Sequence, residues 1–489
     1  MAVPNEEHPD LNLSLLCDFY ELTMGNAYYA NGLGERITYF DLYFRSLPEK
    51  GGYCIAAGLE QAVRYLQALR FTEQDIAFLR AKGIFDEGFL RYLADFRFCC
   101  DVWAVPEGTA VFPNEPLVTV RGPAIQTHLL ETMLLLTINH QTLIATKASR
   151  IVRAAGGRTV MEFGSRRAQG YSSAIYGARA AYIAGCIGSA CTLAEKLFGV
   201  PALGTMSHAW VQMFDSELEA FRTYARQYPD SATLLVDTYN VLESGLPNAI
   251  RAFQEEVLPR GFRPKGIRID SGDIAYLSKQ ARRMLDEAGL NDCKITASNS
   301  LDEYIIRDTI LQGAAVDNFG VGERLITARN EPVLGGVYKL VAVEEEGEII
   351  PKIKVSENVS KITTPHFKRP YRLFDRRNGK AIADVLCVHD ERINDKKPYL
   401  LFDPEYPWKR KRVSNFEARE LLVQVFKRGK LCYDLPALEE IRAHCAASQD
   451  TLWDEVKRFE NPHRYYVDLS RKLWETKQAM LEQSGAGTP

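Results

Sequence analysis

Clusters of charged and glycine residues follow short apolar runs at several places between residues 160 and 325. The first run, 159–163, leads into the segment Gly-Ser-Arg-Arg-Ala-Gln-Gly, which contains Arg166 and Arg167. Guanidinium groups bind planar oxyanions through paired hydrogen bonds, so two adjacent arginines beside glycines are typical of a carboxylate or phosphate site. The structural alternative is one exposed arginine and one arginine in a salt bridge.

A histidine and an aspartate follow the next two runs. Residues 204–208 read Gly-Thr-Met-Ser-His, and His208 is a candidate general base, metal ligand or phosphoryl acceptor. No second histidine or cysteine stands at ligand spacing, which disfavours a metal. Asp237, at the end of the third run, is able to orient an imidazole through its second nitrogen. The alternative for a single histidine is a hydrogen-bonded core residue.

The fourth run ends in Arg-Ile-Asp-Ser-Gly-Asp, at residues 268–273. Strand alternation places Arg268 and Asp270 on the same face. Two acids on either side of Ser-Gly suit ribose hydroxyls or Mg²⁺, and the arginine suits another anion. Capping of the following helix is the alternative for Asp273, but it explains neither Arg268 nor Asp270.

The last run, 316–321, leads into a glycine loop that contains Gly320, Gly322 and Glu323. Closely spaced glycines let backbone N–H groups approach a phosphate. Together, the arginines, the histidine, the aspartates and the glycine loop that follow these runs suit a substrate with several anionic groups and a sugar. The sequence has no Walker A motif, HExxH or GxSxG, so any use of a nucleotide is not of the P-loop kind.

Alternating strand and helix signals position these residues. We expect strands at 159–163, 202–206, 233–237, 266–270, 294–298 and 316–321, and helices at 172–197, 240–257, 274–288 and 302–312. This alternation predicts an α/β fold with a parallel sheet, and the number of units favours a closed or nearly closed barrel. Ligands of such folds bind at the carboxyl ends of the strands, where the charged clusters lie.

The chain outside this region is mixed. We expect residues 1–150 to form an α+β portion with a strand at 38–45 and helices at 59–69 and 127–149, and residues 151–335 to form the barrel. Residues 336–489 read as β-rich and then helical from about residue 435. Because chain termini often lie close together, the two outer portions are expected to form one flanking domain.

Composition excludes several functional classes. The chain has 489 residues, of which 46% are hydrophobic and 25% charged, with a net charge of −3. A charge so close to zero disfavours a dedicated binder of nucleic acid or of anionic membranes. The first ten residues lack the apolar segment of a secretory signal, and the most apolar stretch, 129–138, is too short to span a bilayer. We therefore expect a cytoplasmic protein.

Six ordered motifs bring a family resemblance. They are DFYELTM at 18–24, EFGSRRAQG at 162–170, GTMSH at 204–208, LVDTYN at 235–240, GIRIDSGD at 266–273 and NFGVGERL at 318–325. Through them the chain resembles the nicotinate phosphoribosyltransferase family over roughly residues 11–345. The resemblance implies that nicotinate and 5-phosphoribosyl 1-pyrophosphate give nicotinate mononucleotide and pyrophosphate, with coupled ATP hydrolysis and Mg²⁺, as the first step of NAD salvage from nicotinate. It also implies a type II phosphoribosyltransferase, an irregular α/β barrel with a flanking α+β domain, assembled as a homodimer with shared active sites.

The resemblance also assigns roles to single residues. His208 matches the family's phosphorylated histidine, and Asp237 matches the carboxylate that orients it. Tyr20 matches a tyrosine that the partner subunit stacks on the nicotinate ring, and Phe163 would form the other face. Thr205 and Arg268 match positions of the nicotinate site.

Three acidic residues complete the expected site. Asp270 and Asp273 are the candidates for ribose and Mg²⁺ contacts, and Gly322 and Glu323 fall in the phosphate loop. Glu323 is a departure, because small or hydroxyl residues occur there in relatives. Its side chain is expected either to face Mg²⁺ or to point away from the site.

The sequence leaves three alternative functions. Nicotinamide phosphoribosyltransferase is the nearest alternative, but nicotinate carries a carboxylate that the double arginine and Arg268 would favour. A catalytically inactive barrel that senses a metabolite is the second alternative, and the retained histidine, acids and arginines disfavour it. A barrel aldolase or isomerase is disfavoured because no lysine stands at a strand end to form a Schiff base.

Overall fold

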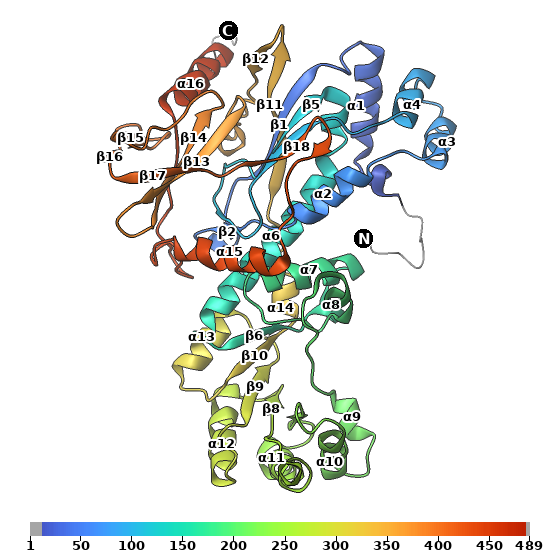
Figure 1. Cartoon of the computed structure of the whole chain (residues 1–489), viewed down its shortest axis with the longest axis vertical. Helices are drawn as coiled ribbons and strands as arrows, with labels where there is room; N and C mark the ends of the chain where they lie inside the picture. Colours follow the sequence, from blue (N-terminus) through green and yellow to red (C-terminus); the bar gives the residue numbers. More distant parts are fainter. Residues whose placement is uncertain (1–11, 486–489) are drawn as a thin grey trace. The chain divides into compact units, whose positions relative to one another are not determined.

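The computed structural model describes residues 12–485, which divide into two compact units. The first unit combines the chain up to Leu143 with the chain from Val333 onward, and the second is Ile144–Pro332 (Figure 1). The first ten residues, on which the expectation about a secretory signal rests, lie outside the described residues. No helix in the described part of the chain has the length and apolarity needed to cross a membrane.

The second unit is built on a parallel sheet. Its strands are β6 (Thr159–Glu162), β7 (Thr233–Leu235), β8 (Gly266–Ile269), β9 (Lys294–Ser298) and β10 (Asn318–Val321), in the order β6-β10-β9-β8-β7. Every neighbouring pair runs parallel. Because the strands are parallel, their carboxyl ends meet at one edge of the sheet. The sequence predicted all five strands close to these positions.

The strand expected at 202–206 was wrong in extent. Only Ala202 pairs there, in a single parallel bridge to Ser189, which itself bridges Glu162 at the end of β6. The backbone N–H of Leu203 still donates to the carbonyl of Ser189. Beyond Leu203 the backbone leaves the ladder and enters a helix at His208, so the β-type sequence has no partner strand to pair with.

Helices connect these strands. They are α7 (Tyr171–Ile183), α8 (Thr192–Phe198), α9 (His208–Gln212), α10 (Glu217–Gln227), α11 (Leu246–Ala252), α12 (Ile274–Glu287), α13 (Glu303–Leu311) and α14 (Glu323–Ile326). Wide helical turns at Val241–Gly245 and Phe253–Val257 flank α11, and 3₁₀ turns lie at Ser165–Arg167 and Leu258–Arg260. The helix expected at 172–197 is two helices, because Gly185 has a positive φ of 115° and Ser189 pairs with the sheet.

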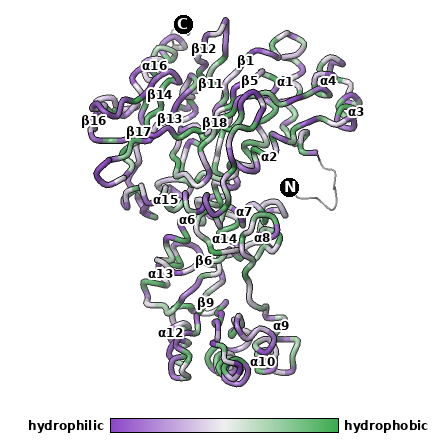
Figure 2. Tube along the Cα trace, in the orientation of Figure 1, coloured by the Kyte–Doolittle hydropathy of each residue, from purple (hydrophilic) through white to green (hydrophobic). Residues whose placement is uncertain are grey.

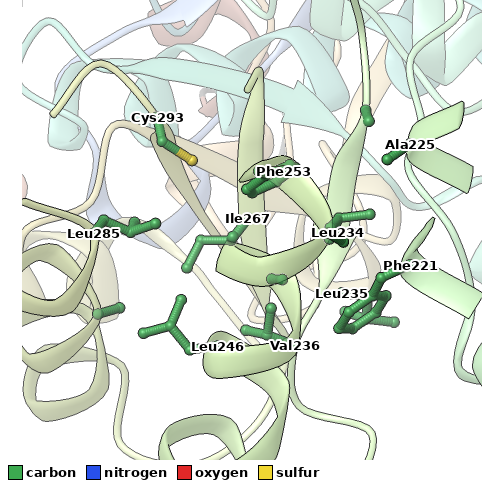
Figure 3. Packing of buried hydrophobic residues seen from close by; sticks show 14 of the residues in the cluster. Phe221, Ala225, Leu234, Leu235, Val236, Leu246, Phe253, Ile267, Leu285 and Cys293 are labelled. Atoms are coloured by element: carbon green, nitrogen blue, oxygen red, sulfur yellow. The ribbon is translucent and has the colours of Figure 1, made fainter. Parts of the chain in front are cut away.

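A buried apolar cluster holds the β7–β8 side of the sheet against its helices. It includes Leu234 and Leu235 of β7, Ile267 of β8, Phe221 of α10 and Leu285 of α12, all with at most 1% exposure (Figure 3). Strands of a parallel sheet are covered on both faces, which explains why these strands are rich in buried apolar residues. Each such side chain contributes about 1.5–3 kcal/mol through burial, so the strand ends are rigidly placed.

In the first unit, strands from both ends of the chain form one seven-stranded sheet. Its order is β12 (Glu348–Pro351), β11 (Gly336–Glu345), β1 (Ile37–Phe44), β5 (Val118–Pro123), β3 (Asp101–Ala104), β18 (Val423–Lys427) and β19 (Lys430–Leu431). N-terminal β1 pairs with C-terminal β11, and β3 pairs with β18, both antiparallel. The N-terminal and C-terminal portions therefore depend on each other for their backbone hydrogen bonds.

The described part of the first unit also contains three smaller sheets and seven further helices. One sheet has the order β17 (Phe416–Glu420), β13 (Lys368–Asp375), β14 (Ala381–Val388) and β20 (Val467–Leu469), and two pairs are β15 (Tyr399–Phe402) with β16 (Arg410–Val413) and β2 (Cys54–Ile55) with β4 (Ala110–Val111). The helices are α1 (Phe19–Ala30), α2 (Leu59–Ala68), α3 (Glu73–Ala81), α4 (Glu87–Ala94), α5 (Ala124–His128), α15 (Leu438–Asp450) and α16 (Arg471–Gly485). Short 3₁₀ turns lie at Leu13–Leu15, Pro48–Lys50 and Val359–Lys361. Helix α6 (Glu131–Ala154) contains the boundary between the two units.

Candidate active site at the strand ends

The carboxyl edge of the parallel sheet carries twelve of the thirteen predicted site residues. They are Phe163, Arg166, Arg167, Thr205, His208, Asp237, Arg268, Asp270, Asp273, Gly320, Gly322 and Glu323. The thirteenth, Tyr20, lies on α1 of the first unit and is described separately below.

Arg268 is the best-anchored side chain of the group. Its Nε donates to Ser298 Oγ at 2.8 Å, Nη1 to Thr205 Oγ1 at 3.1 Å and Nη2 to Asp270 Oδ1 at 2.8 Å. The guanidinium carbon lies 5.7 Å from the centre of the Phe163 ring. Segments that follow four different strand positions thus hold one cation in place, and two of its five N–H groups remain for a ligand.

Ser298 is a site residue that the sequence reasoning missed. It is the last residue of β9, and it is only 2% exposed. Its hydroxyl accepts the hydrogen bond from Arg268 and donates to Asp270 Oδ1, so it joins the cation to the carboxylate. The available signal was a hydroxyl residue at the carboxyl end of a predicted strand.

The imidazole of His208 lies at the start of α9, between a hydroxyl and a carboxylate. Its Nδ1 is 3.1 Å from Thr238 Oγ1, and its Nε2 is 3.9 Å from Asp270 Oδ2. If Nδ1 carries the proton and donates to Thr238, Nε2 has a free lone pair. The side chain is exposed enough for a substrate to reach that nitrogen.

The expected hydrogen bond in which Asp237 would accept from the His208 imidazole is absent, and Thr238 Oγ1 is the partner of Nδ1 instead. Asp237 Oδ2 instead accepts from the backbone N–H of Asp270 at 3.1 Å and from Ser271 Oγ at 2.6 Å. Its Oδ1 is buried and has no hydrogen-bond partner within the described chain. The chain bends after β7, so that Asp237 faces the end of β8 while its neighbour Thr238 faces the histidine.

Glycines bring the loop after β6 close to β10. A Cβ at Gly320 would lie 2.5 Å from Phe163 Cδ2, and a Cβ at Gly322 would lie 3.1 Å from the Phe163 carbonyl oxygen. Only glycine at position 320 leaves room for the aromatic ring in its observed place. The glycine loop therefore also sets the position of the ring beside Arg268.

Glu162 lies beneath this loop and is fully buried. Its carboxylate accepts hydrogen bonds from Ser189 Oγ at 2.5 Å and from the backbone N–H of Gly164. Burial raises the pKa of Glu162 to about 7, although both hydrogen bonds oppose the rise. Because Glu162 holds the residue after Phe163, it supports the ring without facing the ligand space.

Arg166 and Arg167 are exposed in a 3₁₀ turn that follows Phe163. Glu323 lies beside them, with Oε2 3.9 Å from Arg167 Nε and Oε1 3.2 Å from Arg329 Nη1. These contacts are exposed, so each contributes at most about 1 kcal/mol. Glu323 is therefore paired with arginines in this structure, and both arginines of the turn stay accessible to an anion.

The two acids that follow β8, Asp270 and Asp273, have different hydrogen-bond partners. Asp273 caps α12 by accepting from the Tyr276 backbone N–H at 2.8 Å, as the structural alternative for this residue supposed. Oδ1 of Asp270 accepts hydrogen bonds from Arg268 and Ser298, and its Oδ2 faces His208.

Across residues 12–485, no three His, Cys, Asp or Glu side chains are grouped to hold a metal ion. Two carboxylates fit Mg²⁺ only if phosphates and water supply the other ligands, which is its usual mode of binding.

Tyr20 lies on α1 with its ring largely exposed. Partial burial and the neighbouring Glu131 raise the pKa of its phenol above the ordinary value, so the hydroxyl stays protonated. Asp18 begins this helix, with Glu21 hydrogen-bonded back to the Asp18 backbone N–H. A capped helix therefore holds this partly exposed ring.

Comparison with known proteins identifies relatives over nearly the whole chain. Family models match at residues 15–139 (nicotinate phosphoribosyltransferase N-terminal domain), 159–367 (nicotinate phosphoribosyltransferase family) and 367–477 (nicotinate phosphoribosyltransferase C-terminal domain). The Bacillus subtilis nicotinate phosphoribosyltransferase is 43% identical over 474 residues, which cover 97% of this chain and 96% of that protein. The Homo sapiens protein of the same name is 31% identical over 531 residues, covering 97% of each.

Solved structures agree with these relatives. The crystal structure of human nicotinic acid phosphoribosyltransferase superimposes with a TM-score of 0.84 at 30% identity and covers 95% of this chain and 99% of that one. The nicotinate-nucleotide pyrophosphorylase of Pyrococcus furiosus has a TM-score of 0.69 at 23% identity and covers 92% and 98%. The second likeness concerns the fold alone.

Proposed function

This chain belongs to the nicotinate phosphoribosyltransferase family, and we propose that it transfers the phosphoribosyl group of 5-phosphoribosyl 1-pyrophosphate to nicotinate. The products are nicotinate mononucleotide and pyrophosphate, and the reaction belongs to NAD salvage. The observation that carries the proposal is the anchored guanidinium of Arg268, which lies against Phe163 and joins Thr205 to Asp270.

The catalytic unit is proposed to be an irregular α/β barrel of the type II phosphoribosyltransferase kind. Ser189 and Ala202 extend the parallel array beyond β6, at one end of the strand order. Just after Ala202, Thr205 and His208 contact Arg268 of β8 and Thr238 after β7, which belong to the other end of that order. Contacts between the two ends of the strand order support a sheet that curves toward closure.

Nicotinate is proposed to bind on the Phe163 ring, beside Arg268. Its carboxylate takes the unused N–H groups of Arg268 and the Thr205 hydroxyl, and its ring lies on Phe163. Stacking contributes about 0.5–1.5 kcal/mol beyond the burial of area. Tyr20 of the partner subunit would cover the second face of the ring in a homodimer with shared sites.

The reaction forms a bond between the pyridine nitrogen and C1 of the ribose while the bond from C1 to the pyrophosphate oxygen breaks. Positive charge develops on the ribose as the leaving group departs, and the Asp270 carboxylate stabilises it. Arg268 and Ser298 hold that carboxylate in place before substrate binds. Arg166, Arg167 and the loop at 320–323 receive the phosphate groups.

Mg²⁺ would be held by Asp270 and Asp273 and would neutralise the charge of the pyrophosphate. Arg268 compensates the charge of Asp270. The chain's own contribution is therefore to keep two carboxylates at the end of β8, one of them fixed by helix capping.

ATP is proposed to donate its γ-phosphoryl group to Nε2 of His208. The bond from the γ-phosphorus to the bridging oxygen breaks, ADP leaves, and a bond from Nε2 to phosphorus forms. Thr238 holds Nδ1, so the ring presents Nε2 in one orientation. Water later hydrolyses the phosphohistidine and resets the site. We place the enzyme in the cytoplasm, with small-molecule substrates and no nucleic acid partner.

The test is the initial rate of pyrophosphate release with nicotinate and with nicotinamide, each with phosphoribosyl pyrophosphate, Mg²⁺ and ATP. We expect nicotinate to be turned over at least about a hundredfold faster, a difference of roughly 2.7 kcal/mol. A preference for nicotinamide would support the amide enzyme, and no release with either substrate would support the inactive sensor.

Phosphorylation of His208 is tested separately with γ-labelled ATP. We expect acid-labile label on the wild type and none on His208→Ala, with the loss of ATP-stimulated turnover. Equal labelling of the two proteins would remove His208 from the ATP step while leaving the transferase proposal standing.

A further inference from the structure

A second hollow lies in the C-terminal part of the first unit, and the proposed reaction does not use it. Its volume is about 690 Å³, and it is lined from β14, β15, β16, residues 453–456 and residues 463–468. All of its lining residues belong to one unit. Small-molecule sites usually measure about 300–1,000 Å³, so the space suits a ligand of mononucleotide size.

Two buried carboxyl groups line the cavity. Asp403 and Asp468 are 6% and 4% exposed. Burial and the charge of Asp403 raise the pKa of Asp468 to about 7. Asp403 Oδ1 accepts from the backbone N–H groups of Glu405 and Tyr406, which fixes its direction. Buried carboxyl oxygens suit the N–H and O–H donors of a ligand.

Aromatic rings form the walls. Trp453 and Tyr466 line the cavity and remain 42% and 44% exposed, so no protein group covers them fully within the described chain. The indole of Trp453 donates to the carbonyl of Ala381 at 2.9 Å, which holds its ring in place. Exposed, fixed rings of this kind stack on planar ligands.

Exposed cationic side chains also line the cavity. Lys409 precedes β16 and Arg410 and Lys411 belong to it, in a stretch that Figure 2 shows as strongly hydrophilic, and Arg464 precedes β20. Within residues 12–485 neither Lys411 nor Arg464 forms a salt bridge, although the charge of Lys411 acts to lower the pKa of Asp375 and the charge of Arg464 acts to lower that of Asp468. Exposed cations that line a cavity and form no salt bridge attract a phosphate group.

We propose that this cavity is a second ligand site that binds a mononucleotide. The base lies against Trp453 and Tyr466 and donates inward to Asp403 and Asp468, while the phosphate lies outward on Lys411 and Arg464. The lining groups differ in exposure: the two acids are buried, the two rings are partly exposed, and Lys411 and Arg464 are exposed. A nucleotide whose base enters first would meet acceptors with its amino group and cations with its phosphate. This site is independent of the proposed transferase reaction.

The experiment is calorimetric titration of the full-length protein with adenosine 5′-monophosphate. We expect saturable binding, and we expect the double variant Lys411→Glu and Arg464→Glu to weaken it by at least about tenfold. Lys430→Glu, an exposed charge reversal in β19 of the same unit, should leave it unchanged. Pyrophosphate release by the double variant without the nucleotide should equal that of the wild type.

A second pair of variants separates the role of the ring from loss of folding. Tyr466→Leu should weaken binding, whereas Tyr466→Phe should preserve it, because stacking needs the ring and not the hydroxyl. Adenosine and inorganic phosphate alone should each bind at least about tenfold more weakly than the nucleotide. The proposal is overturned if the wild type shows no saturable binding, if the double variant binds as the wild type does, or if Arg268→Gln abolishes binding while the double variant retains it.

Discussion

The hydroxyl of Thr238 lies 3.1 Å from Nδ1 of His208. The other ring nitrogen faces Asp270 Oδ2 at 3.9 Å, a distance that leaves room for movement when a ligand enters. The histidine is therefore held on one side only. This arrangement separates a nitrogen that orients the ring from a nitrogen that can react, which is the division that phosphoryl transfer to an imidazole needs.

Removing the Thr238 hydroxyl should impair the histidine without removing it. We expect Thr238→Val to lower ATP-stimulated kcat/KM by about three- to tenfold, since one hydrogen bond contributes about 0.5–1.5 kcal/mol. Thr238→Ser retains a hydroxyl and should stay within about twofold of the wild type. Turnover without ATP should change little in both variants. Equal rates for the valine variant and the wild type would show that Thr238 does not orient the ring.

Ser298 should affect nicotinate affinity through Arg268. Ser298→Ala removes an acceptor from Nε of Arg268 and a donor to Asp270. Because hydrogen bonds to charged groups contribute about 1.5–3 kcal/mol, we expect the KM for nicotinate to rise by about tenfold or more.

The matched control for Ser298 is Ser231→Ala, which removes an exposed hydroxyl that contacts Asp230. Its kinetic constants should equal those of the wild type. If Ser298→Ala lowered thermal stability but left the KM for nicotinate unchanged, Ser298 would be a structural residue only.

Adding a single methyl group at Gly320 should displace Phe163. The Cβ of Gly320→Ala would lie 2.5 Å from Phe163 Cδ2, so the ring must move. We expect a loss of about 1–3 kcal/mol in the free energy of unfolding, together with weaker nicotinate binding. Gly204→Ala has no atom within 4 Å of the added Cβ and should unfold as the wild type does. Denaturant titration of both variants provides the comparison.

The buried carboxyl of Glu162 should make stability depend on pH. Burial raises its pKa from 4.5 to about 7, so the folded protein binds more protons than the unfolded chain between these values. The stabilising contribution of the protonated form is fully present below pH 4.5 and is lost as pH rises through about 7. The corresponding penalty at higher pH is on the order of 3 kcal/mol.

Glu162→Gln keeps a neutral group of the same shape and should remove this dependence. Relative to the wild type, its thermal midpoint should therefore rise as the pH is increased from 5 to 8. A constant difference between the two midpoints across that range would contradict the raised pKa of Glu162.

Much of the catalytic unit was predictable because its signals are local. The β-branched runs at β7, β8 and β9 and the helical spacing of α12 depend only on neighbouring residues, and all were predicted close to their observed bounds. The split between α7 and α8 was missed. The residues there have ordinary helical spacing, and the break depends on a left-handed Gly185 and on pairing of Ser189 with Glu162, a strand 27 residues away in sequence.

In the candidate site, too, some features follow from the local sequence and others from tertiary contacts. Residue types and their places after apolar runs were enough to select Arg268, Asp270, His208 and the glycine loop, because a strand end with charged side chains can be recognised from the sequence alone. The choice of Thr238 over Asp237 as partner of His208, and the inclusion of Ser298, were decided by the tertiary structure. Hydrogen-bond partners depend on the strand order β6-β10-β9-β8-β7 and on which side of each strand end a side chain leaves, and no local pattern in the chain encodes which strands become neighbours.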